Sequence, residues 1–248
     1  MKFILVGSGS KGNASLIYTD KSLIQIDMGV PLKRIAESLS SIRREEKNIE
    51  GLFLTHEHVD HIGTMGLYHG RVPLFASEGT IDGKNVHLIA PGEYLRIGDF
   101  SLIPFSVSHD AANPLGYLIS DGVTKLAYVT DTGYLPDDDL NLIKDCEYYV
   151  FESNHDLKML LKSDRPAILK KRIHCDTGHL SNVDSATYMA DLIGPRTKKI
   201  YLAHISEECN TPELALMTYR TILRKKGIDL EKIELIAAKQ WEAIYGGD

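Results

Sequence analysis

Seven consecutive residues, 55–61, constrain this chain more than any other feature. They read Thr-His-Glu-His-Val-Asp-His, so three imidazoles and two carboxylates lie in one short segment. Neutral histidine nitrogens and carboxylate oxygens are ligands that suit zinc, manganese or iron. The apolar run 51–54 just before them predicts a short buried strand. We therefore expect a fold in which this strand places the segment at a metal site.

The spacing inside this segment divides its polar side chains into two pairs. His56 and His58 are two residues apart, so an extended backbone would point both imidazoles to the same side. Asp60 and His61 would follow from a turn that folds back toward a second ion. A lone histidine is usually a core or surface residue, and His69, His87 and His174 are expected to be of that kind.

Composition and charge set wider limits. With 248 residues, 43% hydrophobic and 25% charged, the chain is predicted to be one globular domain spanning residues 1–248. The formal net charge of −6 is unlike that of a generic basic nucleic-acid binder, although bound cations would change the local sign at a site. The three cysteines are widely spaced and no CxxC occurs, which disfavours a disulfide scaffold. No segment has the length of a signal peptide or membrane span, so we expect a cytoplasmic protein with no membrane contact.

Short apolar runs alternate with Gly, Asn and Asp breaks, and helical patterns are interleaved in the second half of the chain. Strands are predicted at 2–6, 15–18, 23–27, 51–54, 72–75, 86–89, 94–97, 100–107, 116–119, 125–129, 147–151, 200–203, 233–236 and 243–245. Helices are predicted at 31–41, 157–161, 166–172, 182–192 and 212–226. This order fits an α/β protein with two sheets and helices on their outer faces.

Three further polar residues follow apolar strands. His109 comes after the strand at 100–107, Asp131 after 125–129, and His204 after 200–203. Each one alone could be a strand-end cap or a turn residue. Together, in a chain that carries His-Glu-His-Val-Asp-His, they favour additional metal ligands.

In this order of ligands, HxHxDH, His, Asp, His, the chain resembles the metallo-β-lactamase-fold hydrolases. The resemblance implies a four-layered αββα sandwich that binds two divalent ions, zinc, manganese or iron. It implies that one ion is held by His56, His58 and His109, the other by Asp60, His61 and His204, with Asp131 bridging them. In such a pair a metal-activated hydroxide would attack the substrate, which gives Asp60 a catalytic as well as a ligand role.

Other motifs point to one branch of this superfamily. The loop 7–13, Gly-Ser-Gly-Ser-Lys-Gly-Asn, can present backbone N–H groups to an anion, which makes Ser10 and Asn13 candidate substrate contacts, although a tight turn is the simpler interpretation. With Ala-Ser-Glu-Gly-Thr at 76–80, Glu-Ser-Asn-His-Asp at 152–156 and Gly-His-Leu-Ser-Asn at 178–182, the chain resembles the bacterial YycJ/WalJ-type branch. Members of that branch are described as DNA exonucleases that act from 5′ ends, so nucleic acid, DNA in particular, is the expected partner.

His179 resembles the additional histidine that phosphodiesterases of this fold hold near the scissile phosphate. Glu152 lies where those enzymes carry the glutamate that orients this histidine. His179 would then stabilise charge or protonate the leaving oxygen, with Glu152 as its catalytic partner. The alternative is a structural place beside the N-cap of the following helix. Asn154 and His155 are further candidates for substrate contact.

A basic stretch precedes His179. Lys162, Arg165, Lys170, Lys171 and Arg172 lie within it, and Lys171 and Arg172 are the candidate phosphate contacts. A solvated helix face is an equally good interpretation of the same pattern.

The sequence thus predicts a metal-dependent phosphodiesterase that hydrolyses nucleic acid, in particular a DNA 5′-to-3′ exonuclease. A hydrolase of a small phosphodiester, such as a cyclic phosphate, or of a thioester is the main alternative. A non-catalytic metal-binding regulator is a third possibility, which the complete ligand set disfavours. The oligomeric state does not follow from the residues.

Overall fold

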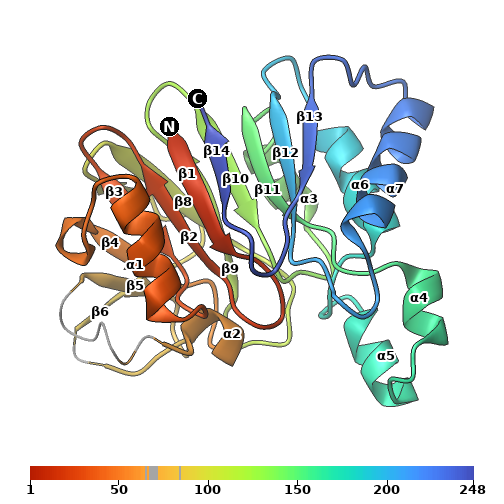
Figure 1. The fold of residues 1–248 in the computed structure, drawn as a ribbon, viewed down its shortest axis with the longest axis horizontal. Coiled ribbons are helices and arrows are strands. Elements are labelled where there is room, and N and C mark those ends of the chain that lie inside the picture. Colours follow the sequence, from red (N-terminus) through yellow and green to blue (C-terminus); the bar gives the residue numbers. More distant parts are fainter. Residues whose placement is uncertain (65, 67–71, 84) are drawn as a thin grey trace. The chain divides into compact units, whose positions relative to one another are not determined.

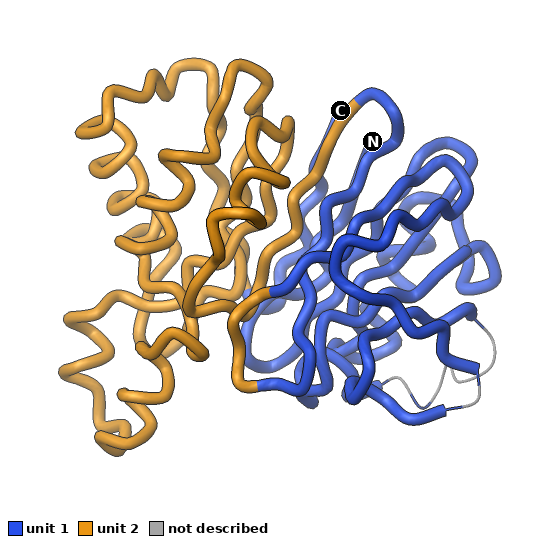
Figure 2. Tube along the Cα trace, turned by 180° about the vertical axis from the view of Figure 1, so that it is seen from behind, with its two compact units in different colours: residues 1–106, 111–123, 240–248 blue, residues 107–110, 124–239 orange. Residues whose placement is uncertain are grey.

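In a computed structural model that describes residues 1–64, 66, 72–83 and 85–248, the chain divides into two compact units (Figure 2). Unit 1 comprises residues 1–106, 111–123 and 240–248, and unit 2 comprises residues 107–110 and 124–239. The single domain over residues 1–248 stays a prediction. The expectation for His69 falls outside the described residues.

Unit 1 contains a seven-stranded mixed sheet with the strand order β14-β1-β2-β3-β4-β5-β6 (Figure 1). Its strands are β1 (Lys2–Gly7), β2 (Ala14–Tyr18), β3 (Leu23–Ile26), β4 (Gly51–Phe53), β5 (Leu74–Ala76), β6 (Val86–Leu88) and β14 (Ile244–Gly247). The pairs from β14 to β3 are antiparallel, and those from β3 to β6 are parallel. Because β3 and β4 are parallel, with Ile26 opposite Phe53, the segments that follow both strands leave the sheet at the same edge.

The remaining strands of unit 1 form an antiparallel run. It consists of β7 (Leu95–Ile97), β8 (Phe100–Ser106) and β9 (Leu115–Ser120). From Phe100 to Pro104 in β8, buried and partly buried residues alternate, as expected for a strand with one face on a core.

Helix α1 (Leu32–Ser41) covers the seven-stranded sheet of unit 1, as Figure 1 shows. Ile35 and Leu39, one helical turn apart, are buried on its inner side. They join a core that includes Ile4, Leu16 and Leu52 from β1, β2 and β4. Burying each aliphatic side chain contributes about 1.5–3 kcal/mol, so this face of α1 holds the helix on the sheet.

Unit 2 contains a four-stranded parallel array, β10-β11-β12-β13. The strands are β10 (Lys125–Val129), β11 (Tyr148–Glu152), β12 (Lys199–Ala203) and β13 (Glu234–Ala237). From Leu126 to Val129, along all of β11, and from Ile200 to Ala203, every residue is buried. Continuous burial of this kind is typical of parallel strands that are covered on both faces.

The helices of unit 2 are α3 (Asp137–Leu142), α4 (Leu157–Lys162), α5 (Ala167–Ile173), α6 (Asn182–Leu192) and α7 (Pro212–Lys225). Figure 1 shows α6 and α7 beside each other, and α7 packs on β13. Side chains cap both N-termini, since Ser181 accepts from the Asp184 amide and Thr211 accepts from the Leu214 amide. Pro212 fits at the first position of α7 because no intrahelical partner is needed for its nitrogen.

Each predicted strand and helix has a counterpart within a few residues of its expected bounds. Pro31 caps α1 instead of opening it. Three short elements were not predicted: the 3₁₀ turn η1 (Glu46–Asn48), α2 (Val59–Ile62) and α3. They have three, four and six residues and lack a full apolar period, which is why the pattern did not indicate them. Among the described residues, no helix is long and apolar enough to span a membrane.

Candidate metal centre

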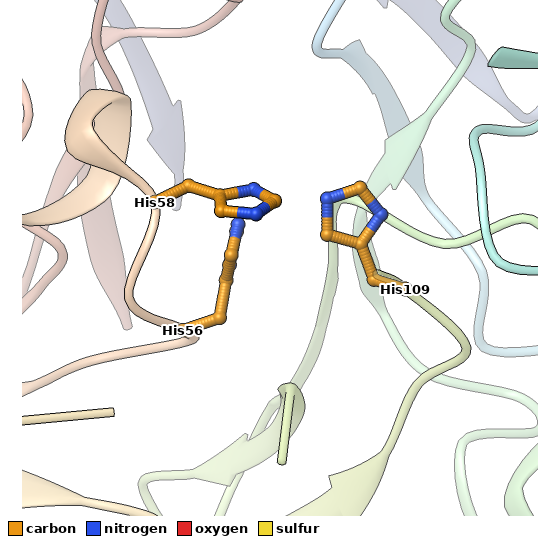
Figure 3. Close-up of side chains that lie close together, drawn as sticks. All are labelled: His56, His58 and His109. Carbon is orange, nitrogen blue, oxygen red and sulfur yellow. The ribbon is translucent and has the colours of Figure 1, made fainter. Parts of the chain in front are cut away.

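The histidine-rich segment lies in unit 1, beyond the carboxyl end of β4. The strand ends at Phe53, so His56 and His58 are carried by the connecting loop and not by the strand itself. Figure 3 shows their imidazoles, which meet edge to face with centroids 4.6 Å apart. His58 is the N-cap residue of α2, and Asp60 and His61 lie in this short helix. The expected turn is therefore a helical turn, and the His61 ring lies 4.1 Å from that of His56.

Asp27 is a member of this cluster that the sequence pattern did not indicate. It follows β3, is fully buried, and its Oδ2 lies 2.7 Å from Nδ1 of His61. The backbone amide and the hydroxyl of Thr55 also donate to this carboxylate. Burial raises the pKa of Asp27, and the bonds from His61 and Thr55 offset part of that effect. A carboxylate that accepts from Nδ1–H leaves Nε2 as the unprotonated nitrogen of His61, which is the form that a metal needs.

Asn13 contacts the same histidine-rich segment, at Asp60 and His61. Its side chain closes the loop by accepting from the Gly9 amide and donating to the Gly9 carbonyl. Its Nδ2 lies 3.0 Å from Nε2 of His61 and 3.4 Å from Oδ2 of Asp60. Asn13 is therefore buried among the ligand candidates, whereas Ser10 is exposed at the tip of the loop. A substrate contact by either residue stays a prediction.

The second cluster lies in unit 2, at the carboxyl ends of three neighbouring strands. Asp131 follows β10, Glu152 ends β11, and His204 follows β12. Parallel pairing places these ends at one edge, since Val129 faces Phe151 and Glu152 faces Ala203. His204 Nδ1 lies 2.9 Å from Glu152 Oε1 and 3.2 Å from Asp131 Oδ1. This edge is therefore a buried concentration of carboxylate oxygens and imidazoles.

Glu152 is the centre of the hydrogen bonds in this cluster. Its Oε1 lies 2.8 Å from Nδ1 of His179, and its Oε2 accepts from the amides of Thr132 and Leu180. Burial by itself would raise the pKa of Glu152, but the charge of His179 and the hydrogen bonds from His179 and His204 lower it to about 2. Glu152 is thus an ionised, fully buried carboxylate that orients His179, whose own side chain is 20% exposed.

His109, the third histidine drawn in Figure 3, belongs to unit 2. Its Nδ1 donates to the Gly178 carbonyl over 3.0 Å, which leaves Nε2 as the acceptor nitrogen of the neutral ring. Burial lowers the pKa of His109, against the opposing charge of Asp131. A neutral imidazole with an oriented Nε2 has the properties of a metal ligand.

Asn154 and His155 are buried behind this cluster. The Asn154 side chain donates to the His204 carbonyl over 3.0 Å, so it supports the loop that carries His204. His155 lies with its Nε2 3.2 Å from Nδ1 of the exposed His174, and burial lowers its pKa to about 4. Their direct contact with substrate stays a prediction.

The basic stretch forms α4, α5 and the turn between them. Arg172 pairs with Asp110, the residue after His109, and Arg165 pairs with Glu208 at 2.9 Å. Lys171 is exposed on α5. Arg172 is therefore paired with a carboxylate next to a candidate metal ligand. The phosphate contacts expected for Lys171 and Arg172 stay predictions.

The donor sets of both clusters fit divalent metal ions. In unit 2, Asp131, Glu152, His179 and His204 each offer a ligand atom, and these atoms lie within 4.8 Å of one another. In unit 1, Nε2 of His61 lies 3.6 Å from Oδ2 of Asp60. Buried imidazoles held in one tautomer, next to carboxylate oxygens, are the chemistry that zinc, manganese and iron select.

Comparison with known proteins agrees with this fold and donor set. A family model described as "Beta-lactamase superfamily domain" matches residues 26–205, and the chain belongs to that superfamily of metal-dependent hydrolases. Within it, the chain is 36% identical over 239 residues to the "Exodeoxyribonuclease YycJ" of Bacillus anthracis, covering 92% of this chain and 90% of the relative. It is also 36% identical over 231 residues to the "Exodeoxyribonuclease WalJ" of Streptococcus pneumoniae, covering 88% and 86%.

A solved structure shows the same architecture. The metallo-β-lactamase fold protein YhfI from Bacillus subtilis superposes with a TM-score of 0.72 at 15% identity, covering 99% of both chains. The predicted α/β metallo-β-lactamase fold and the YycJ/WalJ resemblance are therefore confirmed, and so is the prediction of a hydrolytic enzyme.

Proposed function

We propose that the protein is a two-metal phosphodiesterase that degrades DNA from the 5′ end. The observation that carries this proposal is the pairing of His179 with Glu152, 2.8 Å apart, in the cluster that also holds Asp131 and His204. Two relatives that are 36% identical over most of their length are named exodeoxyribonucleases, which supports DNA as the substrate. The expected cytoplasmic location stays a prediction.

The proposed ligands are the seven residues of the superfamily pattern. They are His56, His58, Asp60, His61, His109, Asp131 and His204. Two divalent ions, when bound, supply a nucleophile at neutral pH and stabilise charge on the phosphodiester. The order of these residues along the chain and the chemistry of both clusters support this set.

The chain's own residues would orient the reaction. Because Glu152 holds Nδ1 of His179, the opposite ring nitrogen, Nε2, is the one that can face the leaving oxygen. A proton at that atom would be transferred as the bond from phosphorus to oxygen breaks. His204 Nδ1 shares the same carboxylate oxygen, so Glu152 links the acid to the proposed metal ligands.

Cleavage of a 5′-phosphorylated duplex labelled at its 3′ end tests this function. Protein stripped of metal and reloaded with manganese or zinc should shorten the labelled strand progressively, and Asp131→Ala should be nearly inactive. His179→Ala should retain its metal and slow turnover by about 10²–10⁴-fold, the scale of lost acid or charge stabilisation. An uncleaved duplex together with turnover of bis-(p-nitrophenyl) phosphate would favour the small-diester hydrolase instead.

A further inference from the structure

Unit 2 contains a pocket that is lined in part by His179, and the proposed chemistry assigns no role to the rest of its lining. Its volume is about 450 Å³, within the usual range for a small-molecule site. Three segments form its walls: the loop after β10 with Tyr134, the turn after α5 with Asp176, and the first turns of α6 with Tyr188. Its lining also includes Gly133, His174, Cys175, Asp184 and Thr187.

Two aromatic side chains, Tyr134 and Tyr188, line this pocket. Tyr134 is 46% exposed, and Tyr188 is partly buried with its hydroxyl accepting from the Leu135 amide at 3.5 Å. Aromatic rings in the sites of nucleic-acid enzymes stack on bases, and such stacking contributes about 1–3 kcal/mol per base. The pocket therefore offers a surface suited to a planar ring.

Two carboxylates in the lining of the pocket suit a neutral base that carries an amino group. Asp176 and Asp184 both line it, and both are exposed. Ser181 donates to Oδ2 of Asp184 over 2.6 Å, which holds that carboxylate at the start of α6. Two carboxylates repel an anion, whereas each can accept from the exocyclic amino group of a base.

The backbone holds the pocket walls close together. A Cβ atom on Gly133 would lie 2.3 Å from the Cys175 carbonyl oxygen, so the loop after β10 lies directly on the turn after α5. The Thr132 hydroxyl donates to the Tyr134 carbonyl over 2.6 Å, and the Thr132 amide donates to Glu152. The carboxylate that orients His179 therefore also anchors the loop that carries Tyr134.

We propose that this pocket binds the base of the 5′-terminal nucleotide of the DNA substrate. The proposal rests on the proposed function and deepens it. Hydrolysis that releases a 5′-nucleotide breaks the bond between phosphorus and O3′ of that nucleotide, while the oxygen of water joins phosphorus. The leaving O3′ takes its proton from His179, so the released nucleoside lies on the His179 side of the phosphorus. The base of this nucleoside therefore fits in the pocket that His179 borders.

The first test measures binding without turnover. Metal-loaded protein is titrated with dAMP and with 2-deoxyribose 5-phosphate by calorimetry, since neither contains a phosphodiester to cleave. Tyr134→Ala and Tyr188→Ala should each weaken dAMP binding by about 5–150-fold, which corresponds to the loss of one stacked base. Binding of the sugar phosphate should not change, and Tyr94→Ala, which removes a 64% exposed tyrosine from unit 1, should behave like the wild type. Equal dAMP affinity in all four proteins would overturn the proposal.

The second test uses two duplexes that differ only in the 5′-terminal residue, adenine or an abasic sugar. The wild type should release the adenine nucleotide faster, and Tyr134→Ala should remove that preference while still cleaving the abasic duplex. Tyr188→Phe, which keeps the ring, should retain the preference. If DNA is cleaved without any preference, the proposal of a base-binding pocket is wrong and the proposed exonuclease activity is supported. If dAMP binding depends on the tyrosines but neither duplex is cleaved, base binding is supported and the proposed exonuclease activity is wrong.

Discussion

Three residues at strand ends share an uncommon backbone conformation. Asp27, Asp131 and His204 have φ angles of 56°, 55° and 52°, in the left-handed region that residues other than glycine rarely adopt. Each such residue costs about 1–3 kcal/mol and persists only where its surroundings hold it. At these three positions a strand has to turn abruptly so that its polar side chain stays at the sheet edge. Arg43 and Asp145, which belong to neither cluster, have the same φ of 56°, so this conformation accompanies the site but does not identify it.

The contact between Asp27 and His61 leads to a prediction. Asp27→Asn should weaken metal binding by about 10–100-fold, because an amide no longer fixes the His61 tautomer as a carboxylate does. Titration of the stripped protein with zinc measures the effect. Asp82→Asn, an exposed change in unit 1, is the matched control and should bind like the wild type. Unchanged affinity in Asp27→Asn would remove Asp27 from the metal centre.

Glu152 should make stability depend on pH in acid. Burial opposes ionisation, yet His179 and His204 lower the pKa of Glu152 to about 2 from an ordinary 4.5. The folded-state pKa is the lower one, so this stabilisation is fully present above pH 4.5 and is lost as the pH falls toward 2. Its size is about 3 kcal/mol.

Urea unfolding of the metal-free protein tests this dependence. Glu152→Gln should be several kcal/mol less stable at pH 7, because a buried amide cannot accept from all four donors. The difference from the wild type should shrink as the pH is lowered from 5 to 3. A difference that stays constant over this range would contradict the role of the ionised carboxylate. Glu45→Gln, an exposed change, should have little effect at any pH.

At the scale of elements, α2 depends on a close contact with the loop after β3. The Met28 amide donates to the His61 carbonyl, and the Asn13 amide donates to the Asp60 carbonyl. A Cβ atom on Gly29 would lie 1.6 Å from the Asp60 carbonyl oxygen, a distance that no side chain can occupy. The loop can therefore hold α2 only if residue 29 is glycine.

Gly29→Ala should accordingly displace α2 and its two candidate ligands. We expect a loss of about 1–3 kcal/mol in the free energy of unfolding, as for overpacked sites, together with weaker zinc binding. Chemical denaturation and metal titration measure the two effects. Gly66→Ala is the control, because the added Cβ meets no atom of the described residues within 4 Å. Wild-type stability and affinity in Gly29→Ala would show that α2 is held in another way.

For the whole molecule, the proposed ligands are spread along the chain from His56 to His204. Bound metal should then stabilise the folded chain by about 2.7 kcal/mol when its concentration is a hundred times the Kd. For a chain of this length that corresponds to a rise in Tm of about 5–10 °C. Thermal scans with zinc, and again with a chelator, measure it. Asp131→Ala should show a much smaller rise, and an equal rise would place the metal elsewhere.

The sequence by itself determined most of the elements and the candidate ligands. The apolar runs predicted β10, β11 and β12, because a strand buried on both faces is a local pattern. That Asp131 and His204 follow such strands is likewise visible in the sequence alone. Glu152 and His179 were paired by family resemblance, and the structure finds them 2.8 Å apart.

The tertiary structure decided which loops meet. Asp27 ends a predicted strand like many other charged residues, and only the parallel pairing of β3 with β4 brings it to His61. The pocket beside His179 likewise needs the loop after β10, the turn after α5 and the start of α6, which are far apart in sequence. Periodicity and spacing report the neighbours of a residue along the chain. Contacts between distant segments depend on strand order and backbone approach, which no local pattern contains.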